Sequence, residues 1–162
     1  AQLVDRWQPQ VIIGHSLGGS AACLYCRNHP KLPLEQLVIM GVPSEFSAIA
    51  DYYSNVLGLS VRMRQALRAS FEQRFQKTYE ELSVAAFCAH IEVPTLVIHD
   101  EEDLLSSADD ARLYAHNLME SELLITAGLG HSLQGTIVYQ RILDYLATAK
   151  TPRSLAQNNK ET

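Results

Sequence analysis

The sequence has few cysteines, no long apolar run and no excess of basic residues. Three cysteines cannot build a disulfide framework, which favours a reducing, cytoplasmic setting. The net charge of −5 argues against nucleic acid and anionic membrane surfaces as partners. No run reaches the roughly 18 apolar residues that a membrane-spanning helix needs. The first residues also lack the pattern of a signal peptide.

Two of the cysteines, Cys23 and Cys26, form a C-x-x-C pattern. The pattern falls inside a predicted helix and has no second pair that could complete a zinc site. We therefore expect both side chains to be small buried apolar groups. The sequence predicts a protein that works without a metal or a cofactor.

The order of apolar runs predicts the fold class. With 47% hydrophobic residues in 162 positions, the chain is long enough for one packed domain. Four short apolar runs predict strands, at 11–13, 37–40, 95–99 and 123–126. Helical patterns accompany them, at 2–8, 20–28, 109–119 and 136–149. This alternation predicts an α/β fold with a parallel sheet flanked by helices on both faces. Residues 150–162 are polar and aperiodic, and we expect a C-terminal tail there.

About fifty residues, 43–92, separate the second and third predicted strands, far more than one connection needs. Met63, Leu67, Phe71 and Phe75 recur every fourth residue and predict a helix. A second helix is predicted over 80–89. We expect this segment to lie over the carboxyl ends of the strands, as a helical cap insertion that shapes an apolar substrate pocket. The alternative is an ordinary helical excursion that fills out the fold.

The first predicted strand leads directly into a serine between glycines. Gly14 and Gly18 lie two residues to either side of Ser16, and a helix-forming segment follows. The pattern predicts a sharp strand-to-helix turn with Ser16 at its tip, where the helix N-terminus faces a reacting group. The alternative is a tight turn in which the serine only caps the helix.

A serine nucleophile needs a base, and the base needs a carboxylate. Asp100 and Asp103 follow the third predicted strand, and His131 follows the fourth. In a parallel sheet these positions share one edge with Ser16. The sequence therefore predicts that a serine, an acid and a histidine meet there.

Three motifs together resemble the α/β-hydrolase family. The stretch G-H-S-L-G-G at 14–19 resembles the nucleophile elbow of that family. Residues 93–103 resemble its strand leading to the acid, and residues 128–131 resemble its histidine loop. The chain order Ser, Asp, His is the order of that architecture. The resemblance covers nearly all of the chain from position 11 to about position 149.

The resemblance implies a role for each motif residue. Ser16 is the expected nucleophile, His131 the general base and Asp103 the acid, with Asp100 as the alternative acid. The backbone N–H of Leu17 is the expected oxyanion-hole donor. The remaining histidines are expected in other roles: His15 in packing or as a substrate-binding pocket wall, and His29, His90, His99 and His116 as structural or surface residues.

The resemblance also implies several strands ahead of the elbow, one of them leading to a second oxyanion donor. Only a predicted helix end, 2–8, precedes the elbow here. We therefore expect residues 1–149 to form a partial core that lacks the N-terminal strands. An apolar strand at 11–13 that lacks its neighbour on one side is an aggregation hazard. We expect a missing segment, or a second copy in a homodimer, to cover it.

The predicted function is that of a serine hydrolase that cleaves an ester or thioester of a small molecule through an acyl-enzyme. Two alternatives stay open. The same three residues could transfer an acyl group to another acceptor or cleave a different bond. The chain could also be a non-catalytic scaffold or binding module that keeps the fold.

Overall fold

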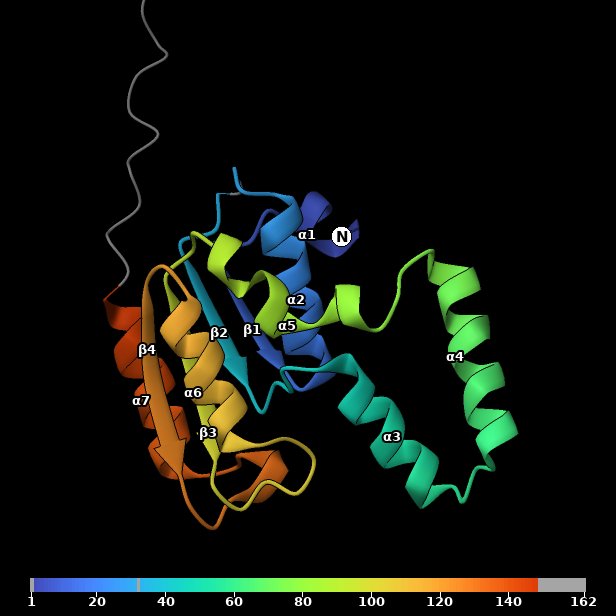
Figure 1. Cartoon of the computed structure of the whole chain (residues 1–162). Coiled ribbons are helices and arrows are strands. Elements are labelled where there is room, and N and C mark those ends of the chain that lie inside the picture. The colour runs from blue at the N-terminus through green and yellow to red at the C-terminus, as the bar shows by residue number, and fades with distance from the viewer. Residues whose placement is uncertain (1, 32, 149–162) are drawn as a thin grey trace, which may run out of the picture.

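The computed structural model describes residues 2–31 and 33–148. Four parallel strands form one sheet in the order β1-β2-β3-β4. Their bounds are β1 (Val11–His15), β2 (Gln36–Met40), β3 (Thr95–Asp100) and β4 (Ser121–Thr126). The four predicted strands are confirmed, each one or two residues longer than predicted. Because all pairs are parallel, every strand ends at the same edge of the sheet (Figure 1).

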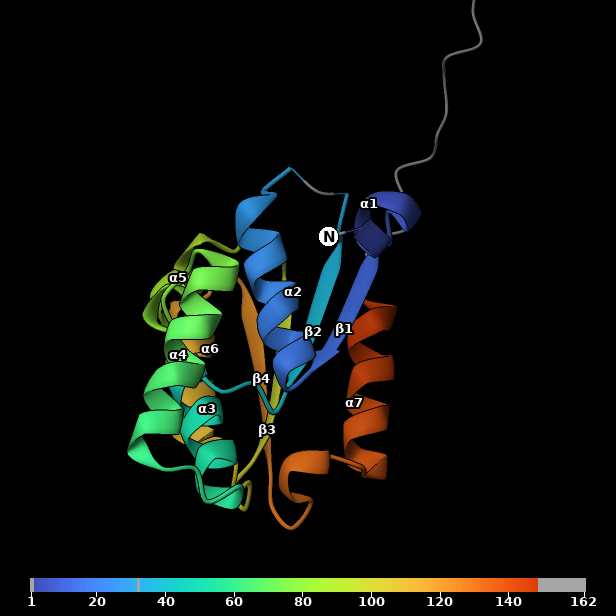
Figure 2. The ribbon, with the colours of Figure 1, turned by 90° about the vertical axis from the view of Figure 1, so that its right-hand side faces the viewer.

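Helices cover both faces of the sheet, as predicted (Figure 2). Their bounds are α1 (Gln2–Trp7), α2 (Leu17–Asn28), α5 (Val84–Phe87), α6 (Ala108–Asn117) and α7 (Thr136–Ala147). Helices α2, α5 and α6 lie on one face and α7 lies on the other. The last residue of the predicted helix, 149, and the predicted tail, 150–162, lie outside the described residues.

The core consists of two apolar clusters, one on each face of the sheet. Side chains of β3 alternate between them, because successive residues of a strand point to opposite faces. Val97 packs in the cluster below α2 and α6, whereas Leu96 and Ile98 pack against α7. Cys23 and Cys26 are unpaired and buried in the first cluster. Burial raises the pKa of the Cys26 thiol to about 11, so this thiol stays protonated at neutral pH.

The prediction of a single helix over 80–89 is wrong. The segment contains the short turn η1 (Glu80–Leu82), the helix α5 and the short turn η2 (Cys88–His90). Ser83 interrupts the run in an extended conformation. Its Oγ and the N–H of Val84 both donate to the carbonyl oxygen of Ser44, at 2.9 and 2.8 Å. These bonds join the two ends of the excursion and compete with a continuous helix.

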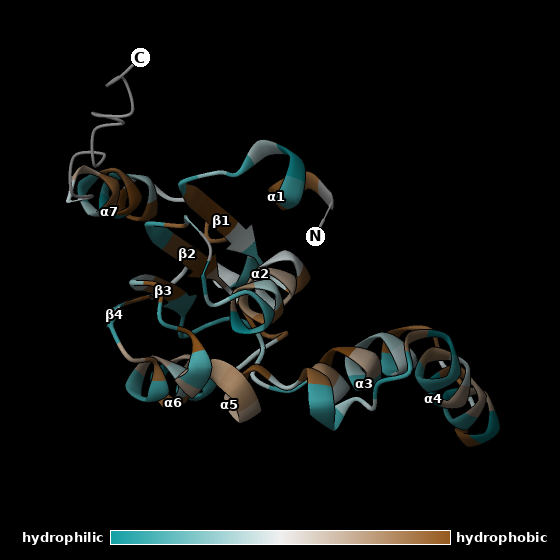
Figure 3. Cartoon of the chain, turned by 90° about the horizontal axis from the view of Figure 1, so that it is seen from above, coloured by the Kyte–Doolittle hydropathy of each residue, from teal (hydrophilic) through white to brown (hydrophobic). Residues whose placement is uncertain are grey.

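The long connection forms two helices, α3 (Phe46–Val56) and α4 (Val61–Phe75), that extend away from the sheet (Figures 1 and 3). The helix predicted by the four-residue spacing is confirmed as α4, and Ser60 Oγ accepts a hydrogen bond from its first turn. No residue of α4 is buried. About half of the Met63 and Leu67 side chains remains exposed, so the apolar face of α4 does not join the core.

Strand β1 is an edge of the described sheet and pairs with β2 on one side. Ile13, in the middle of this strand, is 50% exposed, whereas the apolar residues of β3 are fully buried. The interior strands thus follow the expectation for a parallel sheet that is covered on both faces, and β1 does not.

One buried hydrogen bond ties the helical layer to the edge of the sheet where the strands end. Tyr114 of α6 is fully buried, and its hydroxyl donates to the Val42 carbonyl oxygen at 2.9 Å. We expect Tyr114→Phe to lower the free energy of unfolding by about 1–2 kcal/mol, because a buried carbonyl loses its donor. Tyr139→Phe, at an exposed site of α7, is the matched control and should change it by less than about 0.5 kcal/mol. Urea unfolding of both variants measures the difference, and equal stabilities would contradict the assignment.

Candidate active site

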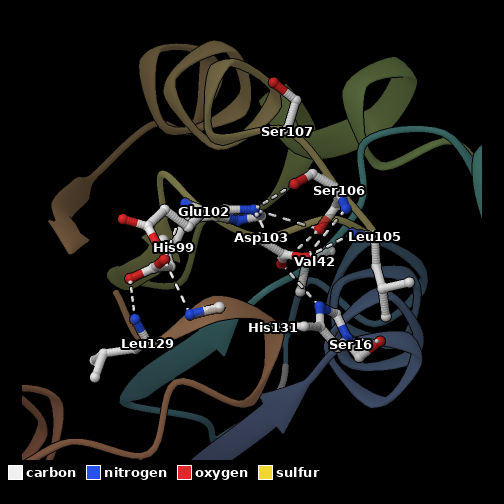
Figure 4. A network of polar contacts seen from close by, with 12 residues as sticks. Ser16, Val42, His99, Glu102, Asp103, Leu105, Ser106, Ser107, Leu129 and His131 are labelled. Carbon is white, nitrogen blue, oxygen red and sulfur yellow. Dashed lines mark hydrogen bonds and ion pairs between the residues drawn. The ribbon is translucent and has the colours of Figure 1, made fainter. Parts of the chain in front are cut away.

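Three loops meet at the edge of the sheet where the strands end (Figure 4). Ser16 directly follows β1, and Asp103 lies in the loop after β3. His131 lies in a short turn after β4, η3 (Gly130–Ser132). The parallel register aligns these strand ends, pairing His15 with Met40 and Asp100 with Thr126. Residues separated by more than 100 positions in the chain therefore lie in one site.

Ser16 occupies a strained turn between β1 and α2. Its φ is +52°, a value that residues other than glycine rarely adopt. Its N–H donates to the Met40 carbonyl oxygen at 2.8 Å, and its carbonyl oxygen accepts from the N–H of Gly19 at 2.9 Å. Its side chain makes no hydrogen bond that would cap α2, so the structure does not support the capping alternative. The backbone instead points Oγ toward the loop after β4.

Close backbone packing at this turn explains two of its glycines. A Cβ on Gly14 would lie 2.6 Å from the Cα of Gly19, and a Cβ on Gly19 would lie 2.3 Å from a methyl carbon of Val42. The sequence pattern emphasised Gly14 and Gly18, yet a Cβ on Gly18 would meet nothing within 4 Å. Only glycine therefore fits without a clash at positions 14 and 19, where β1 and α2 are in contact.

The three predicted site residues form a continuous chain of hydrogen bonds. Ser16 Oγ lies 2.9 Å from His131 Nε2, and His131 Nδ1 lies 2.8 Å from Asp103 Oδ2. The Asp103 side chain is fully buried and that of His131 is 22% exposed. Nδ1 carries a proton in this arrangement, since its partner is a carboxylate, which leaves Nε2 free to accept from the serine hydroxyl.

Hydrogen bonds hold the Asp103 carboxylate in its charged form. Burial alone would raise its pKa, but the bonds from His131, the N–H of Leu105 and the Ser106 side chain bring the pKa below its usual value. Its Oδ1 accepts from the N–H of Leu105 at 2.8 Å, and its Oδ2 accepts from Ser106 Oγ at 3.1 Å. A charged carboxylate beneath His131 stabilises the imidazolium that forms when the histidine takes a proton.

Asp100, the alternative acid, makes a different set of contacts. It is fully buried, and its carboxylate accepts hydrogen bonds from Thr126 Oγ1 and from the N–H groups of Glu102, Leu129 and Gly130. Burial alone would raise its pKa, but these bonds lower the pKa below the ordinary value. Asp100 thus ties the loop after β3 to the loop that carries His131, and Asp103 is the carboxylate that contacts the histidine.

The two residues beside the serine lie on different sides of the site. His15 Nε2 lies 2.7 Å from the carbonyl oxygen of His131, and the two rings are 4.9 Å apart. His15 does not line the cavity above Ser16, and its position corresponds to the packing role. Leu17 is the first residue of α2, so its N–H belongs to the first turn, where the helix supplies no acceptor.

A small cavity opens above Ser16. Its lining contains no Asp, Glu, Lys or Arg. Besides Ser16 and His131, the lining comes from three segments: Pro43 after β2, Ile49, Tyr52 and Tyr53 of α3, and Leu105 and Ser106 after β3. No residue of α4 lines this cavity. Of the two helices in the long connection, only α3 contributes to the site.

Sequence reasoning expected the 43–92 segment to shape the pocket, but it missed Ser106 and the helix α3 that lines the cavity. The lining residues of α3 have no motif, and their place depends on how the 43–92 segment packs.

Within residues 2–31 and 33–148, no group of three His, Cys, Asp or Glu side chains could hold a metal ion. None of the helices described is both long and apolar enough to cross a membrane.

Comparison with known proteins identifies the fold. No protein-family model and no curated protein sequence matches the chain. Solved structures do match. An α/β-hydrolase from a metagenome of Mar Chica lagoon sediments, Morocco, is 18% identical with a TM-score of 0.66, covering 90% of this chain and 65% of that one. The monoacylglycerol lipase of Paleococcus ferrophilus is 16% identical with a TM-score of 0.61, covering 92% and 72%. The chain has an α/β-hydrolase fold.

The similarity to these hydrolases has a defined extent. An esterase from Rhodococcus sp. is 14% identical with a TM-score of 0.59, covering 86% of this chain and 66% of that one. The chain therefore spans about two thirds of the length of the solved hydrolases named here. Structural matches at identities this low establish the α/β-hydrolase fold alone. The activity has to be argued from the site itself.

The turn at Ser16 offers a matched pair of glycine substitutions. We expect Gly14→Ala to cost about 1–3 kcal/mol of stability, because its Cβ would collide with the backbone of Gly19. Gly18→Ala should leave stability unchanged or raise it by up to about 1 kcal/mol, since alanine favours a helix and the site is open. Urea unfolding compares the two variants. Equal losses would show that close packing is not the reason for the glycine at position 14.

Asp100 should contribute stability that depends on pH. Asp100→Asn removes a charged acceptor from four donors, and we expect a loss of about 2 kcal/mol or more at pH 7. Because its pKa is lowered in the folded protein, this stabilisation is present above the ordinary carboxyl pKa of about 4. It is lost as the pH falls through the lower folded-state value. Urea unfolding at several pH values should show the wild-type advantage shrinking toward low pH, and a gap independent of pH would contradict this account.

Proposed function

We propose that this protein is a serine hydrolase that cleaves an ester or thioester bond through an acyl-enzyme intermediate. The observation that carries the proposal is the hydrogen-bonded chain from Ser16 through His131 to Asp103. The geometry matches the roles that nucleophilic catalysis requires: a hydroxyl next to a base, and a base oriented by a buried carboxylate. A serine that only capped a helix would not need this arrangement.

In the proposed reaction, His131 takes a proton from the attacking group and returns it to the leaving group in each of two steps. Ser16 Oγ attacks the carbonyl carbon of the substrate while His131 Nε2 takes its proton. Asp103 keeps the imidazole in the required tautomer and stabilises its positive charge. The bond to the leaving group then breaks, and His131 donates the proton to the departing oxygen or sulfur. Water repeats the sequence on the acyl-enzyme and releases the acid.

The N–H of Leu17 is the proposed oxyanion donor. It follows the nucleophile directly and opens α2, whose positive dipole end faces the site. A backbone amide at this position stabilises the negative charge that develops on the carbonyl oxygen. Loss of one such donor typically costs about a hundredfold or more in turnover.

The cavity above Ser16 supports a small, uncharged substrate group. Its lining holds no Asp, Glu, Lys or Arg side chain that could pair with a charged group of the substrate. The wall of the cavity is mostly apolar where α3 lines it, through Ile49, Tyr52 and Tyr53. The two tyrosines also carry hydroxyl groups. We propose that the 43–92 segment acts as a cap through α3, inserted into the hydrolase core. The solved structures with this fold include an esterase and a monoacylglycerol lipase, in keeping with an ester substrate.

The exposed edge of β1 supports one further part of the proposal. Ile13 is half exposed there, although parallel strands are normally covered. We propose that a strand from another segment of the protein, or from a second copy, pairs with β1. The proposed setting is the cytoplasm, in which buried thiols such as Cys23 and Cys26 remain reduced.

Replacement of the nucleophile tests the proposal. We expect Ser16→Ala to reduce hydrolysis of a short p-nitrophenyl ester at least about a thousandfold, because the covalent step is lost. It should also abolish labelling by a fluorophosphonate, which reacts only with an activated serine. Ser132→Ala, close in the structure but outside the hydrogen-bonded chain, is the control and should retain both. An unlabelled, inactive wild type would instead favour a non-catalytic scaffold.

A further inference from the structure

A second histidine lies beneath the acid loop, outside the chain from Ser16 to Asp103 (Figure 4). His99 belongs to β3 and its side chain is completely buried. Nε2 lies 3.1 Å from the carbonyl oxygen of Ser106, 3.3 Å from Ser106 Oγ and 3.4 Å from Asp103 Oδ2. Nδ1 is buried with no hydrogen-bond partner among the described residues. A fully buried histidine is uncommon, and this one faces the loop that carries the acid.

The surroundings of His99 determine which nitrogen carries the proton. The Ser106 carbonyl oxygen and the Asp103 carboxylate can only accept hydrogen bonds. A bare Nε2 would face both acceptors without a proton, and an Nδ1–H would be buried without an acceptor. The proton therefore lies on Nε2, which donates toward Ser106. His99 thus acts as a donor to the loop after β3.

The hydrogen bonds continue from Ser106 to the proposed acid. Ser106 Oγ donates to Asp103 Oδ2 at 3.1 Å, and its N–H lies 3.3 Å from Asp103 Oδ1. Asp103 Oδ2 is the same oxygen that accepts from His131 Nδ1 at 2.8 Å. His99 and His131 therefore approach one carboxylate from two sides.

We propose that His99 is a positioning residue: through Ser106 it holds the Asp103 carboxylate in the plane that orients His131. This inference rests on the proposed function, since it concerns the same site. His99 is fixed by the register of β3, the most deeply buried strand, whereas Asp103 lies in a loop. The hydrogen bond from His99 to Ser106 transfers the rigidity of the sheet to that loop. At metal sites, removal of the hydrogen-bond partners that orient the ligands typically costs about 10- to 100-fold in affinity or activity. We expect an effect near the lower end of that range here.

Three variants separate positioning from simple packing. His99→Phe keeps a ring of similar shape and removes the donor. His99→Gln restores an N–H donor at a similar reach. Thr95→Val is the matched control, because Thr95 is a buried polar residue at the other end of β3. Its hydroxyl donates to the Val93 carbonyl oxygen and, among the described residues, to no other acceptor.

Kinetics with a short p-nitrophenyl ester give the first measurement. We expect His99→Phe to lower kcat about tenfold with KM changed less than about twofold, because orientation of the base matters in the transition state rather than in substrate binding. His99→Gln should recover most of kcat. Thr95→Val should keep the wild-type kcat, even where it lowers stability.

A second measurement does not depend on turnover. The proton on His131 Nδ1, bound to a carboxylate, gives a downfield NMR resonance that His131→Gln identifies by its loss. We expect His99→Phe to shift or broaden this resonance, His99→Gln to restore it and Thr95→Val to leave it unchanged.

The outcomes separate this inference from the proposed function. Wild-type kcat and an unshifted resonance in His99→Phe would overturn the inference while the hydrolase proposal stands. The inference would also be overturned if His99→Gln lowered kcat as much as His99→Phe, because that result would indicate that His99 only fills space in the core. If the wild type neither hydrolyses esters nor reacts with fluorophosphonate, the proposed function fails, and the resonance still decides whether His99 positions Asp103.

Discussion

Parallel pairing of four strands is the constraint on which the site depends. Each strand in this sheet ends at the same edge, so the loops after β1, β3 and β4 converge although they are far apart in sequence. A register slip of one residue would turn the apolar side chains of a strand to the opposite face. The burial of β3 on both faces makes such a slip costly. The packing of the core thereby holds the spacing of Ser16, Asp103 and His131.

The loop after β3 contains two aspartates with separate tasks. Asp100 accepts hydrogen bonds from both loops and joins them, while Asp103 contacts the histidine. Both carboxylates are buried, and both have a lowered pKa because donors surround them. Without those donors, burial would favour the neutral acid. Backbone and side-chain donors therefore keep both carboxylates charged, and Ser106 and His99 complete the hydrogen bonds beneath Asp103.

The two helices of the long connection, α3 and α4, differ in their burial and in their contribution to the site. Ile49, Tyr52 and Tyr53 of α3 reach the cavity above Ser16. Helix α4 is the longer helix, yet it buries no residue and contributes nothing to the lining. Its apolar spacing is enough to form a helix. Burial depends instead on a partner surface. Phe71 of α4 packs only against the rings of Phe46 and Tyr79 and its helical neighbour Phe75 among the described aromatic residues. Figure 1 shows α4 apart from the sheet.

The sequence by itself determined the strands, the turn at Ser16 and the residues that could meet there, because these follow from local apolar patterns, from the glycines around Ser16 and from the parallel class of sheet. The order of the strands in the sheet came from the structure. Only the tertiary structure decided the rest. It placed Asp103 rather than Asp100 against His131, broke the predicted helix at Ser83 and moved the steric demand from Gly18 to Gly19. It also buried His99 beneath the acid. Each of these depends on contacts between segments distant along the chain, and such contacts leave no periodic signal in the sequence.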